Sequence, residues 1–325
     1  MTAPGGPLGE FELIRRIRGM APAHPSVALG IGDDAAVLRP PPAGSSTVVT
    51  TDLLLDGRHF LLDECGPEAA GYKSLAVNLS DVAAMAARPV AAFVAVALPK
   101  RSAEEIAEGL MAGMAPLANR FSLALAGGDT NAWDGPLVVC VTVIGEASPP
   151  APVLRSGARP GDVVLVTGPL GGSILGRHLR PEPRVAEALA LLEAAELHAL
   201  IDLSDGLASD LGHVLDESGG LGASLDAHSI PIHPDAERLA SRSGRSPLDH
   251  ALGDGEDFEL CLVVPPESAA SLLRSPPPGV TLHRVGEIEP GPGIRLRDRD
   301  GSTAPVRVRG FDHLGAGGEA GGHAG

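Results

Sequence analysis

Acidic residues beside glycines and at predicted strand ends are the most chemically suggestive feature of this sequence. The acids of this set, most of which lie beside a glycine or at a strand end, are Asp33, Asp34, Asp52, Asp56, Asp81, Asp129, Asp202, Asp205, Glu256 and Asp257. Glycine lets a ligand approach the backbone closely. Mg²⁺ binds few carboxylates and keeps several waters, so such positions suit an ion held between protein and phosphate groups. The set therefore indicates metal-assisted phosphate chemistry.

Each of these acids also has a structural explanation, because Asp is favoured in turns and at helix N-termini. Asp81 fits that explanation poorly. It lies inside a predicted helix, three residues after Asn78, where Leu75, Leu79 and Val82 form an apolar stripe. An unpaired carboxylate in an apolar segment is costly. We therefore expect Asp81 to bind a ligand or to pair with a charged group.

Two glycine-containing loops give weaker signals for phosphate. Residues 168–173, GPLGGS, follow a predicted strand and form either an anion-binding nest of backbone N–H groups or an ordinary strand-to-helix turn. Residues 127–130, GGDT, are expected to end a strand with Asp129 at the tip, as a tight turn or as a loop that admits phosphate. The sequence has no P-loop, protein-kinase or dinucleotide-binding motif, which argues against those nucleotide-binding classes.

The elements that must position Asp52 and Asp81 follow from the pattern of apolar residues. Residues 47–55, TVVTTDLLL, predict a buried strand that carries Asp52 near its end. Pro67 starts a predicted helix that runs through Asp81 and stops before Pro89. A strand and a helix therefore deliver these two acids.

The next elements complete one α/β unit. Ser102 and Glu105 predict the capping box of a helix that reaches about residue 119, and residues 136–147 predict a further strand. Residues 148–162 concentrate Pro, Gly and Ser, as linkers between domains do. We expect one domain over residues 1–150 and a second over 151–325.

The second half repeats the alternation of strands and helices. Residues 201–206, IDLSDG, lead into a helix whose buried face is expected to consist of Leu207, Leu211, Val214 and Leu215. The Gly-rich tail from about residue 314 has no apolar pattern and is expected to be disordered. The predicted fold class is therefore α/β (α+β), with two domains.

Composition excludes several classes of protein. A net charge of -16 and a pI near 5.0 argue against a nucleic-acid or anionic-membrane partner, because both need clustered Lys and Arg. Three cysteines without a C-x-x-C pair support neither a disulfide framework nor a zinc cage. No apolar stretch approaches the ~20 residues that span a bilayer. A cytoplasmic protein is expected.

Six segments, taken in order, resemble the thiamine-monophosphate kinase family within the aminoimidazole ribonucleotide synthetase superfamily. They are GIGDDAAVL, TTDLLLDGRHF, GYKSLAVNLSDVAAMAARP, GGDT, DLSDGLASDL and GDGEDFEL. The resemblance implies an N-terminal domain whose sheet forms a barrel in a homodimer, and a C-terminal α/β domain. It also implies an ATP site between the domains of each subunit.

The resemblance further implies roles for individual residues. The implied ligands of several Mg²⁺ ions are Asp33, Thr50, Thr51, Asp52, Asp81, Asp129, Asp202 and Asp205. The implied ATP contacts are Gly128, Asp129, Arg155 and Ser204. The implied contacts to thiamine monophosphate are His59, Glu256 and Phe311.

The implied reaction moves the γ-phosphoryl group of ATP onto thiamine monophosphate, the last step in making thiamine diphosphate. The acceptor is a phosphate monoester with a second pKa of about 6, so it is already ionised at neutral pH. No catalytic general base is therefore expected. Direct in-line transfer aligned by metal ions is the expected mechanism.

Three positions depart from the family pattern. Gly172 replaces an acid, so its loop is expected to bind phosphate through the backbone alone. Phe311 replaces a larger or more polar aromatic residue, and Asp254 replaces a glycine near Glu256. The alternatives are another ATP-using relative, such as aminoimidazole ribonucleotide or selenophosphate synthetase, or an inactive nucleotide-binding regulator. The first cysteine, Cys65, lies outside any N-terminal reactive loop, which argues against a selenophosphate synthetase.

Overall fold

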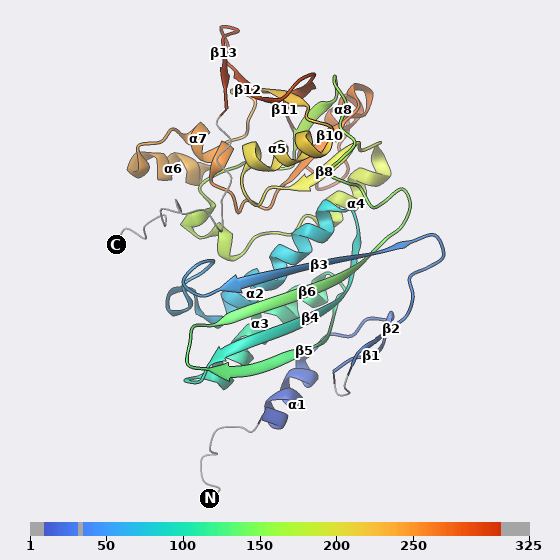
Figure 1. Cartoon of the computed structure of the whole chain (residues 1–325), viewed down its shortest axis with the longest axis vertical. Helices are drawn as coiled ribbons and strands as arrows, with labels where there is room; N and C mark the ends of the chain where they lie inside the picture. The colour runs from blue at the N-terminus through green and yellow to red at the C-terminus, as the bar shows by residue number, and fades with distance from the viewer. Residues whose placement is uncertain (1–9, 32–34, 307–325) are drawn as a thin grey trace, which may run out of the picture. The chain divides into compact units, whose positions relative to one another are not determined.

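The computed structural model describes residues 10–31 and 35–306 (Figure 1). The chain divides into two compact units, one made of residues 1–154 and 176–195 and the other of 155–175 and 196–325. The predictions for Asp33, Phe311 and the tail from about residue 314 lie outside the described residues. None of the described helices is long and apolar enough to cross a membrane. The cytoplasmic location stays a prediction.

The first unit is a four-stranded sheet with helices on one face (Figure 1). The sheet consists of β3 (Ser46–Leu55), β6 (Val138–Ala147), β4 (Arg88–Pro99) and β5 (Ala124–Trp133), in that order. The two long helices are α2 (Leu62–Ala84) and α3 (Ala103–Arg120). The remaining elements are α1 (Glu10–Met20), β1 (Val27–Leu29), β2 (Val37–Leu38), the 3₁₀ helix η2 (Arg177–Leu179) and α4 (Val185–Ala194).

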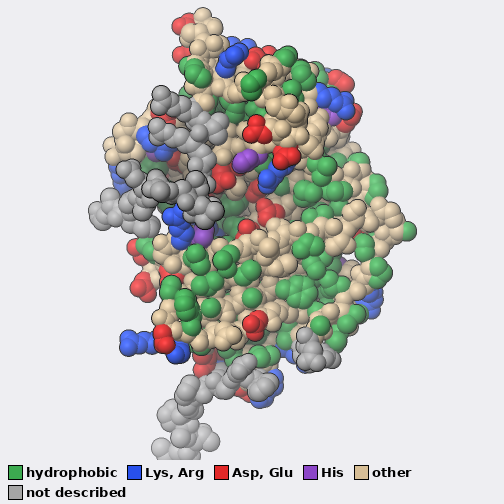
Figure 2. Space-filling model, viewed as in Figure 1, with side chains coloured by type: hydrophobic (Ala, Val, Ile, Leu, Met, Phe, Trp, Pro, Cys, Tyr) green, Lys and Arg blue, Asp and Glu red, His purple; other side chains and the backbone are tan. Residues whose placement is uncertain are grey.

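Strand β3 confirms the strand predicted at 47–55, and its side chains alternate between two environments. Thr50, Asp52 and Leu54 are partly or fully buried on the face toward α2. Val49 and Leu53, on the opposite face, are 61% and 53% exposed. Figure 2 shows hydrophobic side chains gathered over this part of the sheet. The sheet therefore has one face covered by helices and one face that exposes apolar side chains.

Helix α2 confirms the helix predicted from Pro67. The non-helical Gly66 (φ 73°) separates a short first turn from the main helix. Leu75, Leu79 and Val82 are fully buried, as their spacing predicted. The helix is also buried on its other sides, which include the polar side chain of Asn78 at 0% exposure.

Two local predictions in this unit are wrong. Ser102 has a left-handed φ of 63° and makes no side-chain cap, so the capping box with Glu105 does not form. Residues 127–130 continue strand β5 instead of turning, because they pair in parallel with β4. At Gly128 a Cβ would lie 1.8 Å from the Val94 carbonyl oxygen, so the approach of the neighbouring strand requires glycine.

The second unit is a seven-stranded sheet with helices. The strand order is β13 (Thr303–Pro305), β12 (Gly293–Arg297), β9 (Gly222–Asp226), β11 (His283–Glu289), β7 (Val163–Val166), β10 (Leu260–Val264) and β8 (Ala199–Asp202). The helical elements are η1 (Ser173–Leu175), α5 (Leu207–Glu217), α6 (Pro234–Ser243), α7 (Pro247–Gly253) and α8 (Pro266–Arg274). All pairs are antiparallel except β9 with β12. The predicted buried face of α5 is confirmed, since Leu207, Leu211, Val214 and Leu215 are at most 2% exposed.

Candidate functional site

Thr50, Asp52 and Asp81 form a cluster between β3 and α2 in the first unit. Thr50 and Asp52 are two residues apart on the strand, so both side chains point toward the helix. Thr50 Oγ1 donates a short hydrogen bond to Oδ2 of Asp81. Asp81 therefore has a hydrogen-bond partner in Thr50, whose hydroxyl is neutral, and the predicted ligand or paired-charge role of Asp81 stays a prediction.

The charges of this cluster repel each other in a partly buried place. Burial raises the pKa of the Asp52 carboxyl from 3.8 to about 6, and the nearby Asp81 carboxylate adds to the rise. A cation bound to both carboxylates would offset both effects. The atoms available to bind a metal are carboxylate and hydroxyl oxygens, and oxygen ligands are those that Mg²⁺ prefers. The residues present therefore fit a magnesium ion.

Thr51 and Asp129, also predicted as ligands, lie on the opposite face of the same sheet. Thr51 pairs with Thr142 of β6, and the two Oγ1 atoms are 3.0 Å apart. Asp129 pairs with Ala95 of β4 and is exposed, and its Oδ1 accepts a hydrogen bond from the Thr130 N–H at 3.0 Å. Paired residues share a face of a sheet. The structure thus brings Thr50, Asp52 and Asp81 together and leaves Thr51 and Asp129 outside that cluster.

His59 lies in the loop between β3 and α2. Its Nδ1 accepts a hydrogen bond from the Leu55 N–H at 2.9 Å. Oδ1 of Asp56 accepts the Leu62 N–H at the start of α2, also at 2.9 Å, and so anchors the end of the loop. Because Nδ1 is an acceptor, a neutral His59 ring carries its proton on Nε2.

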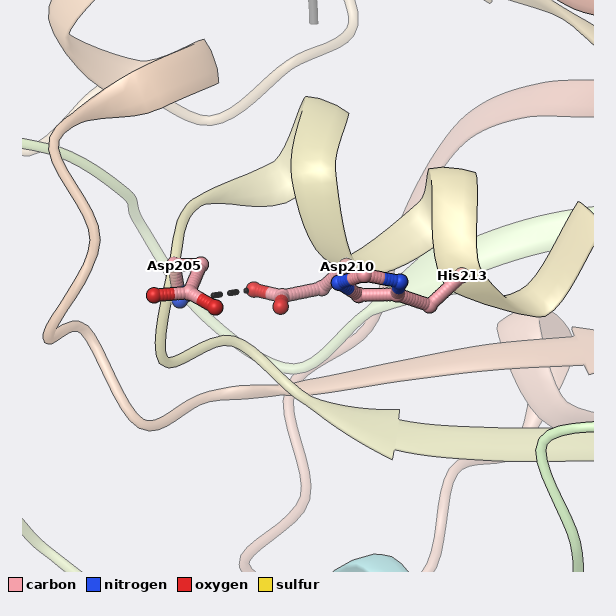
Figure 3. Close-up of side chains that lie close together, drawn as sticks. All are labelled: Asp205, Asp210 and His213. Atoms are coloured by element: carbon pink, nitrogen blue, oxygen red, sulfur yellow. Dashed lines mark hydrogen bonds between the residues drawn. The ribbon is translucent and has the colours of Figure 1, made fainter. Parts of the chain in front are cut away.

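A second acidic cluster lies in the second unit and consists of Asp202, Asp205 and Asp210. Figure 3 shows Asp205 and Asp210. Asp202 ends β8 and Asp205 follows it in the turn before α5. Oδ2 of Asp210, in the first turn of α5, accepts the Asp205 N–H at 3.0 Å. Burial, then the charges of Asp202 and Asp205, raise the pKa of Asp210 to about 8.

Asp210 and His213 were not predicted as site residues. One ligand atom each from Asp205, Asp210 and His213 lies within 4.8 Å of the others (Figure 3). The i, i+3 spacing of Asp210 and His213 on one helix face was the available signal. Carboxylate oxygens suit Mg²⁺, whereas imidazole is more typical of transition metals. The carboxylates of Asp205 and Asp210 are therefore better magnesium ligands than the His213 imidazole.

Ser204 and Glu256 lie beside each other in the second unit. The Ser204 carbonyl accepts the Glu256 N–H at 2.7 Å, and the Leu203 carbonyl accepts the Phe258 N–H at 2.9 Å. Glu256 and Phe258 both have left-handed φ values, 53° and 52°, which non-glycine residues adopt only when other contacts compensate. These two hydrogen bonds hold the loop that presents Glu256. Arg155 is an exposed residue at the start of this unit.

The prediction that the loop at Gly172 binds phosphate through its backbone alone is wrong. The Gly172 N–H donates to Asp254 at 2.9 Å, and the Gly171 N–H donates to Asp257 at 2.8 Å. Asp254 also accepts a hydrogen bond from Arg245 Nη1 at 2.9 Å. The N–H groups of Gly171 and Gly172 therefore already donate to carboxylates of the protein. Asp254 links the Gly172 loop to Arg245 through hydrogen bonds to both.

Two family models match the chain. The AIR synthase related protein N-terminal domain matches residues 32–147, and the C-terminal domain matches residues 159–299. The thiamine-monophosphate kinase of Rhodopirellula baltica is 44% identical over 310 residues, which cover 94% of this chain and 97% of the relative. The thiamine-monophosphate kinase of Escherichia coli K12 is 36% identical over 329 residues, covering 94% and 98%.

Solved structures give the same result. The crystal structure of thiamine-monophosphate kinase from Stenotrophomonas maltophilia is 37% identical with a TM-score of 0.76, covering 91% of this chain and 98% of that one. A structure of AaThiL complexed with AMPPCP and TMP is 27% identical with a TM-score of 0.73, covering 96% and 100%. The chain therefore has the mixed α/β fold of these proteins, with a sheet in each of two domains.

Proposed function

Because this chain belongs to the thiamine-monophosphate kinase family, we propose that it transfers the γ-phosphoryl group of ATP to thiamine monophosphate, giving thiamine diphosphate and ADP. The observation that carries the proposal is the cluster of Thr50, Asp52 and Asp81, in a chain that matches such kinases over nearly their whole length. Asp52 and Asp81 carry like charges and repel each other, so they do not form a structural ion pair. Together with the nearby hydroxyl they suit the binding of a divalent cation.

Magnesium ions are the cofactor, and carboxylates of both units are their ligands. Asp52, Asp81 and Thr50 hold the cation of the first unit, and Asp202 and Asp205 those of the second. The family resemblance also implies Asp33, Thr51 and Asp129 as ligands; Thr51 and Asp129 lie on the opposite face of the sheet, so they would hold a different ion from the one at Asp52 and Asp81. Bound magnesium would neutralise the phosphate charges and align the reacting groups. Gly128, Asp129, Arg155 and Ser204 contact ATP in this proposal.

The acceptor needs no general base. The phosphate of thiamine monophosphate has a second pKa of about 6, so an oxygen is already ionised at pH 7. The protein has to bring two anions together, which requires compensating positive charge. The reaction is a direct in-line transfer without a phosphorylated enzyme.

Three residues bind thiamine monophosphate in this proposal. His59 offers its Nε2–H to the acceptor, since Nδ1 is occupied by the Leu55 N–H. Glu256, held by Ser204, attracts the positive thiazolium ring. Phe311 contributes an aromatic face to the same ring, where a cation–π contact stabilises by roughly 0.5–1 kcal/mol.

The open face of the first sheet is where a second copy binds. Val49 and Leu53 are exposed there by 61% and 53%, and Cys140 of β6 pairs with Leu53 on the same face. Apolar side chains exposed together on a sheet usually mark an interface. The homodimer barrel thus consists of two such four-stranded sheets, formed by residues 1–150 of each chain. Leu53→Lys is expected to give monomers in size-exclusion chromatography with light scattering, and a dimer of unchanged mass would refute this arrangement.

A direct assay tests the activity. Purified protein is mixed with ATP, Mg²⁺ and thiamine monophosphate, and the thiochrome derivative of thiamine diphosphate is measured. We expect thiamine diphosphate with thiamine monophosphate as the acceptor and much less product with thiamine, which lacks the ionised phosphate. Absence of thiamine diphosphate refutes the proposed function.

A further inference from the structure

Lys73 is a charged side chain buried inside the first unit. It lies in α2 with 1% of its surface exposed, among the largest fully buried side chains in the described part of the chain. Burying an ammonium group is costly, and replacing buried charges by apolar side chains often leaves a protein as stable as before. Packing alone therefore does not explain a lysine here.

The Lys73 ammonium group holds the backbone of the His59 loop. Its Nζ donates to the His59 carbonyl oxygen at 2.7 Å. The same residue is held through its ring, by the Leu55 N–H at 2.9 Å, and through its own N–H, which donates to the Leu55 carbonyl at 3.0 Å. A loop residue outside any helix or strand is thus fixed at three atoms.

Holding His59 at these three atoms determines the direction in which its Nε2 proton points. With Nδ1 as an acceptor, the neutral His59 ring has a single N–H, on Nε2, to offer a ligand. His59 is half-buried. Because the ring is attached to this backbone, movement of the backbone would turn the Nε2–H away from a bound anion. A binding group keeps its geometry only when the residues behind it are held in place.

We infer that Lys73 is a positioning residue for thiamine monophosphate: it fixes the His59 backbone so that the ring offers Nε2–H to the acceptor. The inference rests on the proposed function and on the His59 contact within it. In this inference Lys73 acts through the backbone of His59. Its loss should therefore affect binding of thiamine monophosphate much more than binding of ATP.

The test is steady-state kinetics of Lys73→Met, with KM measured separately for the two substrates. We expect KM for thiamine monophosphate to rise about tenfold, the scale of one lost hydrogen bond to a charged group. KM for ATP and kcat should stay within about twofold, since neither depends on this donor. Lys100→Met is the matched control, because the Lys100 side chain is 58% exposed in the same unit. It should leave every constant unchanged.

A double-mutant cycle separates positioning from a general structural effect. In a His59→Ala background no ring donor remains, so adding Lys73→Met should raise KM for thiamine monophosphate no further. Lys73→Gln, which keeps an N–H donor, should restore part of the affinity and decides the question if Lys73→Met does not fold. The inference fails, and the proposed function stands, if KM for thiamine monophosphate is unchanged in the Lys73 variants. The same holds if Lys73→Met raises this KM equally with and without the His59 ring. A wild-type protein that makes no thiamine diphosphate overturns the proposed function, and the inference with it.

Discussion

Asp52→Asn should stabilise the metal-free protein while it removes activity. The Asp52 pKa of about 6 against an ordinary 3.8 corresponds to about 3 kcal/mol, at ~1.4 kcal/mol per pKa unit. Because folding raises this pKa, the folded state is favoured most below pH 4, and this stability is lost as the pH rises through 6. The asparagine carries no charge, so the variant should be more stable by about 3 kcal/mol at pH 8 and by about half of that at pH 5.

Urea unfolding in the presence of a chelator measures this difference. Trp133, the single tryptophan of the sequence, lies in β5 of the first unit, so its fluorescence reports unfolding of that unit. Asp129→Asn is the matched control, because the Asp129 side chain is exposed on the opposite face of the sheet, and it should change stability little. Added Mg²⁺ should stabilise the wild type and reduce the advantage of Asp52→Asn. Equal stability of wild type and Asp52→Asn at pH 8 would refute the reasoning.

Three further predictions concern single positions. Gly128→Ala should prevent folding or strongly destabilise the first unit, because its Cβ would lie 1.8 Å from the Val94 oxygen; a variant that melts like the wild type contradicts this. Asp254→Ala should lower the free energy of unfolding of the second unit by about 1–3 kcal/mol in circular-dichroism melts, because the Gly172 N–H loses its acceptor. The Mg²⁺ concentration for half-maximal activity should rise as the pH falls below about 6, because protons compete for Asp52; a constant value from pH 5 to 8 would show that Asp52 is not a ligand.

The sequence predicted the elements of the first cluster well. Alternation in TVVTTDLLL placed Thr50 and Asp52 on one face of a strand, and β3 confirms that strand. The acid in the apolar part of α2 was predicted to bind a ligand or a charged group, and it accepts a hydrogen bond from Thr50 on the facing strand. Local periodicity was sufficient here because each side chain's direction follows from its own strand or helix.

Contacts between distant segments were not predictable in the same way. The GGDT segment was expected to turn, yet pairing with β4 keeps it extended, and only the register of that pairing explains Gly128. Gly172 was expected to offer its N–H to phosphate, yet Asp254, 82 residues away, occupies it. Asp210 and His213 were missed because the convergence of a turn and a helix face depends on the fold of the second unit. Sequence spacing did not reveal that Gly128 would pair with Val94, or that Gly172 would donate to Asp254.

The most direct test of the account is a Mg²⁺ titration of thiamine diphosphate formation by wild type and Asp81→Asn. Both proteins are assayed at saturating ATP and thiamine monophosphate, after melting curves have shown that the variant is folded. We predict a rate that rises with Mg²⁺ for the wild type and no product above background for Asp81→Asn at any Mg²⁺ concentration. Wild-type turnover by folded Asp81→Asn would contradict the claim that the carboxylates between β3 and α2 hold the catalytic magnesium.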